Sequence, residues 1–139
     1  RVDQAAWLRA RLVDLFFGDW DRHLGQWRFA GIRQADGSRT YLPIARDRDQ
    51  AFANYDAFGL TLAKITSPER RTLRPFSADY GSIGWLTYSG RDLDPLFLNG
   101  LTHAQWQAEA ANVKAALTAP VIRWLTVPSA APPTAPPRH

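Results

Sequence analysis

A ten-residue segment from Gly18 to Trp27 gathers the residue types that can do chemistry. It holds two carboxylates, a guanidinium, an imidazole, an amide and two indoles. The segment has no regular apolar period, so the burial of one face does not explain its composition. Loops that mix polar and aromatic groups are where binding and catalytic residues concentrate. We therefore expect this segment to form half of a metal–phosphate site.

A predicted β-hairpin joins this segment to a second acidic one. Strand-like runs over 27–34 and 39–45 flank an Asp-Gly turn signal at 36–37, a combination typical of a hairpin. Pro43 cannot donate to a ladder, so we expect the second strand to lie at an edge or to bulge there. The two ends of a hairpin are neighbours, so acidic residues on either side of it should lie close together.

Three side chains can then converge on one divalent cation: Asp21, Gln26 and Asp47. Carboxylate and amide oxygens are hard ligands that suit Mg²⁺ or Mn²⁺, which proteins hold through one or two carboxylates plus substrate phosphates. A carboxylate that is not a ligand can orient a hydroxyl or a water as a general base. The absence of cysteine excludes disulfides and zinc–thiolate sites.

Neighbouring residues can extend this site, and each has an ordinary structural alternative. His23 can contact phosphate or ligate the metal, or it can brace the loop. Asp19 and Asp49 can act as further ligands, or they can cap the backbone and pair with arginine. Trp20 and Trp27 are expected to pack in the core and hold the loop.

The positive charge is almost entirely arginine. Seventeen basic residues against thirteen acidic ones give a net charge of +4, and only residues 64 and 114 are lysine. Arginine suits bidentate contacts to phosphate, so Arg22 and Arg48 are candidates for holding a nucleotide or a phosphorylated small molecule, with pairing to acids as the alternative. No basic run forms a nucleic-acid stripe, and no apolar run is long enough for a membrane span.

Residues 21–26 (DRHLGQ) resemble the D-R-H-x-x-N catalytic loop of phosphoinositide kinases. They are also similar to the D-x-H-x-x-N loop of HipA-like and aminoglycoside kinases and to the D-R-H-x-x-E loop of secretory-pathway Golgi kinases. In those families a short hairpin leads to a D-x-G-x-x-F metal motif, which residues 47–52 (DRDQAF) match at Asp47 and Phe52.

This resemblance implies an α+β, mainly helical fold, namely a protein-kinase-like C-terminal lobe with a catalytic-loop β-hairpin. It implies Asp21 as the catalytic base, with His23 as its neighbour in the same loop. The implied ligands of Mg²⁺ or Mn²⁺ are Gln26 and Asp47, and Asp49 beside them is a further candidate ligand. The implied cofactor is ATP.

Three departures from the kinase pattern bear on activity. Gln26 stands where the families have Asn or Glu, and Asp49 stands where the metal motif has glycine. Only about twenty residues precede Asp21, whereas a kinase needs an N-terminal lobe with a phosphate-covering loop and a Lys–Glu pair. The resemblance therefore implies a fragment that is inactive alone and is completed by a missing N-terminal lobe or by neighbouring envelope domains.

The chain up to about residue 127 also resembles an uncharacterised bacterial family. Its motifs GDWDRHxxQWRW and PIxRDRDQxF stand here at 18–29, with Phe29 for the last Trp, and at 43–52. In that family these regions occur in larger envelope-associated proteins, some beside metallophosphoesterase or outer-membrane surface-antigen domains. The resemblance implies a periplasmic or outer-membrane context and assigns no activity.

Two other functions remain open. A metal-dependent phosphohydrolase would hold two ions, with ligands drawn from Asp19, Asp21, His23, Asp47 and Asp49. A non-catalytic module would instead bind an envelope partner and tolerate the loss of these side chains.

The elements that must position these residues are expected to be mainly helical. A helix over 4–17, capped by Asp3 and stopped by Gly18, carries apolar residues at spacings of three or four. Its expected buried stripe is Ala5, Leu8, Leu12, Leu15 and Phe16. The residues expected to lie mostly off that stripe are Arg9, Arg11 and Asp14.

Shorter elements should follow the second acidic segment. They are a helix over 56–66, a long ordered loop over 67–91, one or two turns over 92–98, a helix over 103–117 and a final helix over 120–125. Thr102 and Gln105 form a capping box, and the stripe behind it is Ala104, Ala108, Ala111 and Ala115. These elements predict one domain over 1–127 and a proline-rich flexible tail or linker over 128–139.

Overall fold

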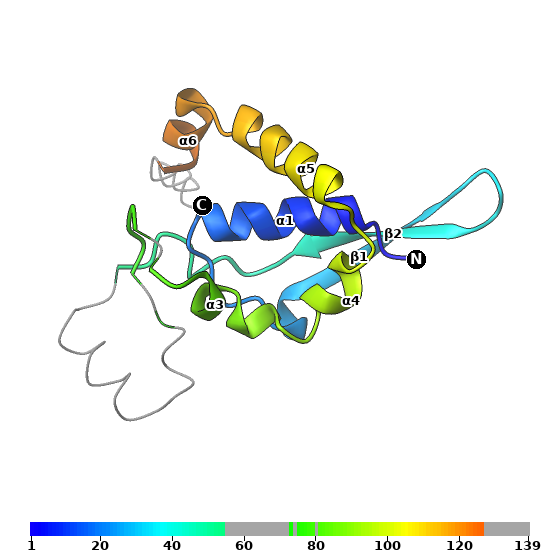
Figure 1. The fold of residues 1–139 in the computed structure, drawn as a ribbon, viewed down its shortest axis with the longest axis horizontal. Helices are drawn as coiled ribbons and strands as arrows, with labels where there is room; N and C mark the ends of the chain where they lie inside the picture. Colours follow the sequence, from blue (N-terminus) through cyan, green and yellow to red (C-terminus); the bar gives the residue numbers. More distant parts are fainter. Residues whose placement is uncertain (55–72, 74, 80, 127–139) are drawn as a thin grey trace, which may run out of the picture.

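The computed structural model describes residues 1–54, 73, 75–79 and 81–126. Within them the chain is α+β, with helices packed beside one two-stranded antiparallel sheet (Figure 1), which confirms the expected fold class at this level. The elements are α1 (Gln4–Phe16), η1 (Leu24–Gln26), β1 (Trp27–Arg33), β2 (Arg39–Ala45), α3 (Ile83–Leu86), η3 (Tyr88–Gly90), α4 (Asp94–Leu98), α5 (His103–Ala116) and α6 (Ala119–Thr126). The helix expected over 56–66 and the tail over 128–139 lie outside the described residues.

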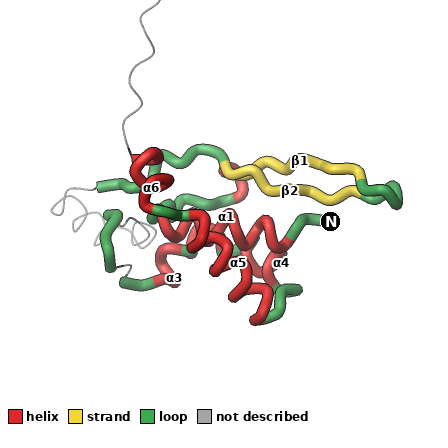
Figure 2. The backbone as a smooth tube through the Cα atoms, turned by 90° about the horizontal axis from the view of Figure 1, so that it is seen from above, coloured by secondary structure: helices red, strands yellow, loops and turns green. Residues whose placement is uncertain are grey.

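The predicted hairpin is confirmed. β1 and β2 pair in unbroken register from Trp27 opposite Ala45 to Arg33 opposite Arg39. Gly37 has φ +84°, which an L side chain adopts only with strain. The Asp36 carboxylate accepts the Ser38 N–H at 2.9 Å and so closes the turn. Figure 2 shows the hairpin projecting beyond the helices.

The register explains why Pro43 fits inside β2. The N–H of Tyr41 donates to the carbonyl of Arg1 at 2.8 Å, and its carbonyl accepts from the N–H of Asp3 at 2.9 Å, so the Tyr41 backbone faces away from β1. Positions two residues apart face the same way in an antiparallel ladder. Pro43 therefore lacks an N–H where β1 requires none, and no bulge is needed.

Helix α1 begins and ends as expected. The Asp3 carboxylate accepts the N–H of Ala6 at 2.9 Å and caps the first turn. At the other end Gly18 has φ +68°, and its N–H donates to the carbonyl of Leu15 at 3.1 Å. These contacts satisfy backbone groups that a helix terminus leaves without intrahelical partners.

The expected buried face of α1 is wrong in its composition. The buried residues of α1 are Trp7, Leu8, Arg11 and Asp14, so Leu8 alone of the expected stripe is buried and its other members are half-buried. Arg11 and Asp14 tolerate burial because each meets an opposite charge, which apolar periodicity does not register.

Trp7 lies at the centre of the core. Its ring centroid lies 4.3 Å from that of Trp27, 4.7 Å from that of Phe97 and 6.3 Å from that of Phe29. Trp7 and Trp27 are buried, and Leu93 completes the cluster. Helix α1 contacts β2, α4 and α5, so it joins the hairpin to the C-terminal helices.

The expectation of a loop over 67–91 is wrong for its last part. Residues 83–90 form α3 and the η3 turn, and Leu86 is buried with 3% of its surface exposed. The Thr87 hydroxyl donates to the carbonyl of Ile83 at 3.0 Å. Glycines at 84 and 90 hid this helical stretch in the sequence, because glycine lowers helix propensity.

The C-terminal helices follow the predicted bounds within two residues. Thr102 and Gln105 form the expected capping box at the start of α5. The expected alanine stripe is exposed, however, and Val113 is the buried residue of α5. Arg9 also joins α1 to α5 through a bidentate ion pair with Glu109, at 2.9 and 3.1 Å. No helix in the described ranges is both long and apolar enough to cross a bilayer.

Replacing the central indole should be far more costly than replacing a peripheral one. Trp7→Ala should lower the free energy of unfolding by about 3–5 kcal/mol, because it empties the middle of the core. Trp106→Ala, at a residue with 37% exposure, should cost about 1 kcal/mol or less. Urea unfolding followed by circular dichroism measures both, and equal costs would contradict this description of the core.

Candidate functional site

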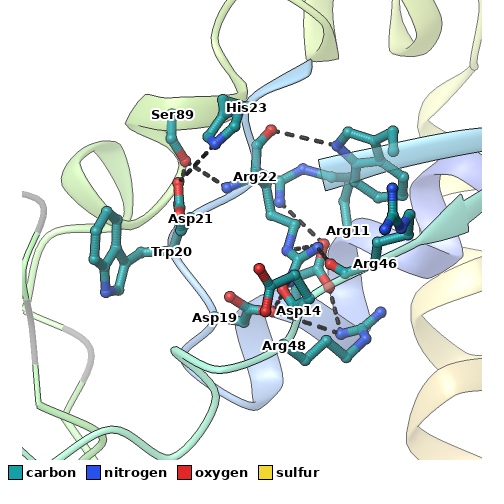
Figure 3. Close-up of polar contacts among 12 residues, drawn as sticks. Arg11, Asp14, Asp19, Trp20, Asp21, Arg22, His23, Arg46, Arg48 and Ser89 are labelled. Carbon is teal, nitrogen blue, oxygen red and sulfur yellow. Dashed lines mark hydrogen bonds and ion pairs between the residues drawn. The ribbon is translucent and has the colours of Figure 1, made fainter. Parts of the chain in front are cut away.

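Arg22 joins the two acidic segments. Its side chain is completely buried, and Figure 3 shows it among Asp14, Asp19 and Arg46. The guanidinium donates from Nη1 to the carbonyl of Arg46 and from Nη2 to the carbonyl of Asp47, at 2.7 Å each. A second tie runs through the backbone, where the N–H of Arg46 donates to the carbonyl of Gln26 at 2.8 Å. The loop before the hairpin and the segment after it are therefore held in direct contact.

Two buried carboxylates surround this guanidinium. Asp19 pairs with Nη2 of Arg22 and lies 3.9 Å from Nη1 of Arg48. Asp14, with no exposed surface, lies 3.6 Å from Nε of Arg22 and accepts from Arg48 at 2.5 Å and from Arg11 at 3.2 Å. Three arginines thus share two carboxylates at this point.

Asp94 extends the cluster to helix α4. Nε of Arg11 donates to both Asp94 oxygens, at 2.9 and 3.1 Å, and the indole N–H of Trp7 donates to Oδ1 at 3.0 Å. We call the six residues the buried charge network. Its members are Arg11, Asp14, Asp19, Arg22, Arg48 and Asp94, which carry three positive and three negative formal charges.

Burial changes the acid–base behaviour of the network. Burial raises the pKa of Asp19 to about 6, although the Arg22 guanidinium acts in the opposite direction. It also raises the pKa of Asp14, against the pull of Arg48 and Arg22. Removing a carboxylate from water penalises its charged form, and here that penalty exceeds the gain from the neighbouring arginines.

Ser89, in η3, forms hydrogen bonds with the backbone of the loop. The Ser89 hydroxyl donates to the carbonyl of Trp20 and accepts the N–H of Arg22 at 2.8 Å. Trp27, expected in the core, is buried and donates its indole N–H to the carbonyl of Arg22 at 3.3 Å. The loop is therefore held on both of its sides.

Asp21 and His23 lie on a different side of the loop from the network. Figure 3 shows Asp21 near Ser89 and His23, away from the guanidinium of Arg22. His23 Nδ1 accepts the N–H of Gly25 at 3.0 Å, so the neutral ring carries its proton on Nε2, which lies 3.8 Å from Oδ1 of Asp21. The Asp21 side chain is 26% exposed and the His23 side chain is 56% exposed, so both can contact a ligand from solvent.

The predicted metal ligands are accessible. Asp47 and Asp49 are exposed and Gln26 is half-buried. Asp47 has φ +47°, a left-handed conformation that is uncommon for residues other than glycine. Asp49 accepts from Nε2 of Gln50 at 3.0 Å. Among the described residues, the Asp21 carboxylate is paired with His23.

The described residues contain no group of three or more His, Asp or Glu side chains arranged to hold a metal ion. A divalent cation here would depend on fewer protein oxygens and on phosphate oxygens for the rest. Mg²⁺ is commonly bound in this way. The accessible oxygens of Gln26, Asp47 and Asp49 are chemically suited to that arrangement.

The two arginines expected to bind phosphate differ in their surroundings. Arg22 has no exposed surface, and its guanidinium holds backbone carbonyls and Asp19. Arg48 retains 34% exposure while Asp14 anchors its Nη1. As placed, Arg22 positions the loops, and only Arg48 has surface with which to contact a ligand.

Sequence reasoning missed four residues that hold this site together, namely Arg11, Asp14, Ser89 and Asp94. A signal for two of them was present, because Trp7, Arg11 and Asp14 recur at spacings of four and three and so share one helix face. No comparable signal marks Ser89 or Asp94, which are brought in by the path of the chain after the hairpin.

Comparisons with known proteins found no match. No family model, no curated protein and no solved structure matches this chain.

Removing the Arg22 guanidinium should destabilise the fold strongly. Arg22→Met should cost about 3–5 kcal/mol, because it strands buried carboxylates without their partner. The matched change Arg91→Met, at a side chain that is 52% exposed, should cost about 1 kcal/mol or less.

Adding Asp19→Leu to Arg22→Met should recover part of the loss, because it removes one stranded charge. Urea unfolding of the four proteins measures these differences. If Arg22→Met costs no more than Arg91→Met, the network does not support the fold.

Asp19 should make stability depend on pH in a definite direction. Its folded-state pKa of about 6 lies above the ordinary value of 3.8, so folding takes up a proton between these values. The resulting stabilisation is fully present below pH 3.8 and is lost as pH rises through about 6.

The Asp19→Asn variant lacks the proton uptake of Asp19 and retains the contributions of the other titratable groups. Wild type should therefore lose more stability than the variant between pH 4.5 and pH 7.5, as measured by urea midpoints at about five pH values across this range. Parallel pH profiles for the two proteins would contradict the assignment.

Proposed function

We propose that this chain is the catalytic-loop half of a kinase-like phosphotransferase. It would supply the base and the metal ligands for transfer of a phosphoryl group from ATP to an acceptor. The observation that carries the proposal is the contact of Arg22 with the carbonyl oxygens of Arg46 and Asp47, at 2.7 Å each. Phosphoryl transfer depends on a base and metal ligands held in fixed positions, and this contact fixes the two segments that carry them.

Each accessible residue then has a role. Asp21 acts as the base for the acceptor hydroxyl, and His23, with its proton on Nε2, orients the Asp21 carboxylate. Gln26 and Asp47, with Asp49 beside them, hold Mg²⁺ or Mn²⁺ together with nucleotide phosphates. The metal supplies charge neutralisation on those phosphates when it is bound.

The backbone of Asp47 supports this assignment. A residue other than glycine at φ +47° persists when the surrounding structure holds it there, and such strain concentrates at active sites. Here the holding group is Arg22, which binds the carbonyl of Asp47 from within the protein. Arg22 thereby holds the backbone of a residue with an accessible carboxylate, without contacting a ligand itself.

The phosphohydrolase alternative has less support. It would recruit Asp19 to one of two metal ions, yet Asp19 has 1% exposure and is paired with Arg22. A single cation completed by phosphate oxygens needs no contribution from Asp19. In the kinase-like proposal a nucleotide-covering lobe completes the centre, and this chain alone does not turn over ATP.

A titration of Mn²⁺ with a non-hydrolysable ATP analogue tests the proposal. Saturating amounts should raise the melting temperature of wild type by about 3 °C, because the ligands bind only the folded state. The shift should be smaller or lost in Asp47→Asn and retained in Asp92→Asn, a control at a carboxylate that is 82% exposed. If wild type and both variants give no shift with Mn²⁺ and analogue, the metal-dependent assignment fails.

A further inference from the structure

The outer edge of β1 is open among the residues that the structure describes. β1 pairs with β2 on one side, and no other described strand lies along its second side. The far edge of β2, by contrast, carries the N-terminal segment, which pairs through Val2 and Tyr41 in parallel orientation. The hairpin therefore already accepts a short added strand at one of its two edges.

The register identifies the backbone groups at the open edge. Gly31 lies directly opposite Tyr41, whose N–H and carbonyl face away from β1. Opposite residues in an antiparallel pair either bond to each other or both face outward. The N–H and carbonyl groups of Gly31 therefore face outward, as do those of Phe29 and Arg33, and an unpaired row of this kind is a template for another strand.

The charge along this edge has one sign. β1 carries Arg28 and Arg33 and no acid, and Arg33 lies directly opposite Arg39 on β2. Like charges directly opposite destabilise a sheet. In the part of the chain that the structure describes, none of these three arginines has an acidic partner, and Arg28 donates only to backbone carbonyls.

The arginines of the body are arranged differently. Each of the following pairs with at least one carboxylate: Arg9, Arg11, Arg22 and Arg48. Three of the described arginines without an acidic partner therefore lie on the hairpin, which projects beyond the helices in Figure 2. This charge favours an anionic partner and disfavours a second copy, whose β1 edge would bring arginines against arginines.

We propose that β1 is a docking edge for an extended acidic segment of another protein, which adds to the hairpin as a further strand. Its backbone would pair with the outward groups of Phe29, Gly31 and Arg33. Successive side chains of a strand point to opposite faces, so its carboxylates would meet Arg28 on one face of the sheet and Arg33 on the other. This mode of recognition takes affinity from main-chain hydrogen bonds and specificity from side chains along the strand. It does not depend on the phosphotransferase proposal.

The probe for this proposal is a capped seven-residue valine peptide with glutamate at its first and sixth positions, because residues five apart project to opposite faces of a strand, as Arg28 and Arg33 do. A peptide with lysine in place of glutamate is the matched comparison. Amide exchange followed by nuclear magnetic resonance should slow by about tenfold at Gly31 and Arg33 with saturating acidic peptide, because these N–H groups gain a partner. The N–H of Ile32, which faces β2, should change little, and neither sample contains metal or nucleotide.

A charge reversal makes the test specific. Arg28→Glu combined with Arg33→Glu should weaken the acidic peptide by about tenfold or more and favour the lysine peptide. Arg91→Glu, between η3 and α4, should leave the affinities for both peptides unchanged. If the double variant does not fold, the milder Arg28→Gln replaces it in the test. This change should weaken binding of the acidic peptide by about threefold.

Three results would overturn the proposal. One is equal binding of the acidic and lysine peptides to wild type. Another is protection of Gly31 and Arg33 that grows with protein concentration in the absence of peptide, which would identify a second copy as the occupant. The third is the absence of protection at these amides at any peptide concentration.

Discussion

The rest of this structure depends on the burial of one guanidinium among opposite charges. Arg22 has no exposed surface, and it binds a carboxylate from its own loop and two carbonyl oxygens from beyond the hairpin. An unpaired charge in that position would be prohibitively costly. The chain must therefore bring Asp14 and Asp19 to it, and this requirement sets the approach of α1 to the hairpin.

Buried ion pairs add little net stability compared with apolar packing, but removing one partner is severe. Because any arrangement that leaves one of these charges unpaired is costly, the network favours one arrangement of the two loops over others. The aromatic cluster around Trp7 provides the apolar burial, while the network fixes how the loops meet. Asp94 connects the two, because it accepts from both Trp7 and Arg11. A substitution in either part should therefore affect the other.

The network also separates the acidic residues into two kinds. Asp14 and Asp19 are buried and serve the fold, whereas Asp21, Asp47 and Asp49 retain exposed surface near the same junction. Asp19 and Asp21 stand two residues apart in one loop, so their positions in the sequence do not separate the two kinds. The proposed phosphotransferase centre uses only the exposed kind, and the proposed docking edge on β1 lies apart from both.

The sequence by itself determined the elements whose signals are local. The caps at Asp3 and Thr102 and the turn at Gly37 follow from contacts within a few residues, and that turn sets the register of the hairpin. Only the tertiary structure decided that Arg22 faces inward and that Ser89 and Asp94 hold the site. The free energy of burying a charged side chain depends on which distant groups replace the water around it. Apolar periodicity carries no information about those partners.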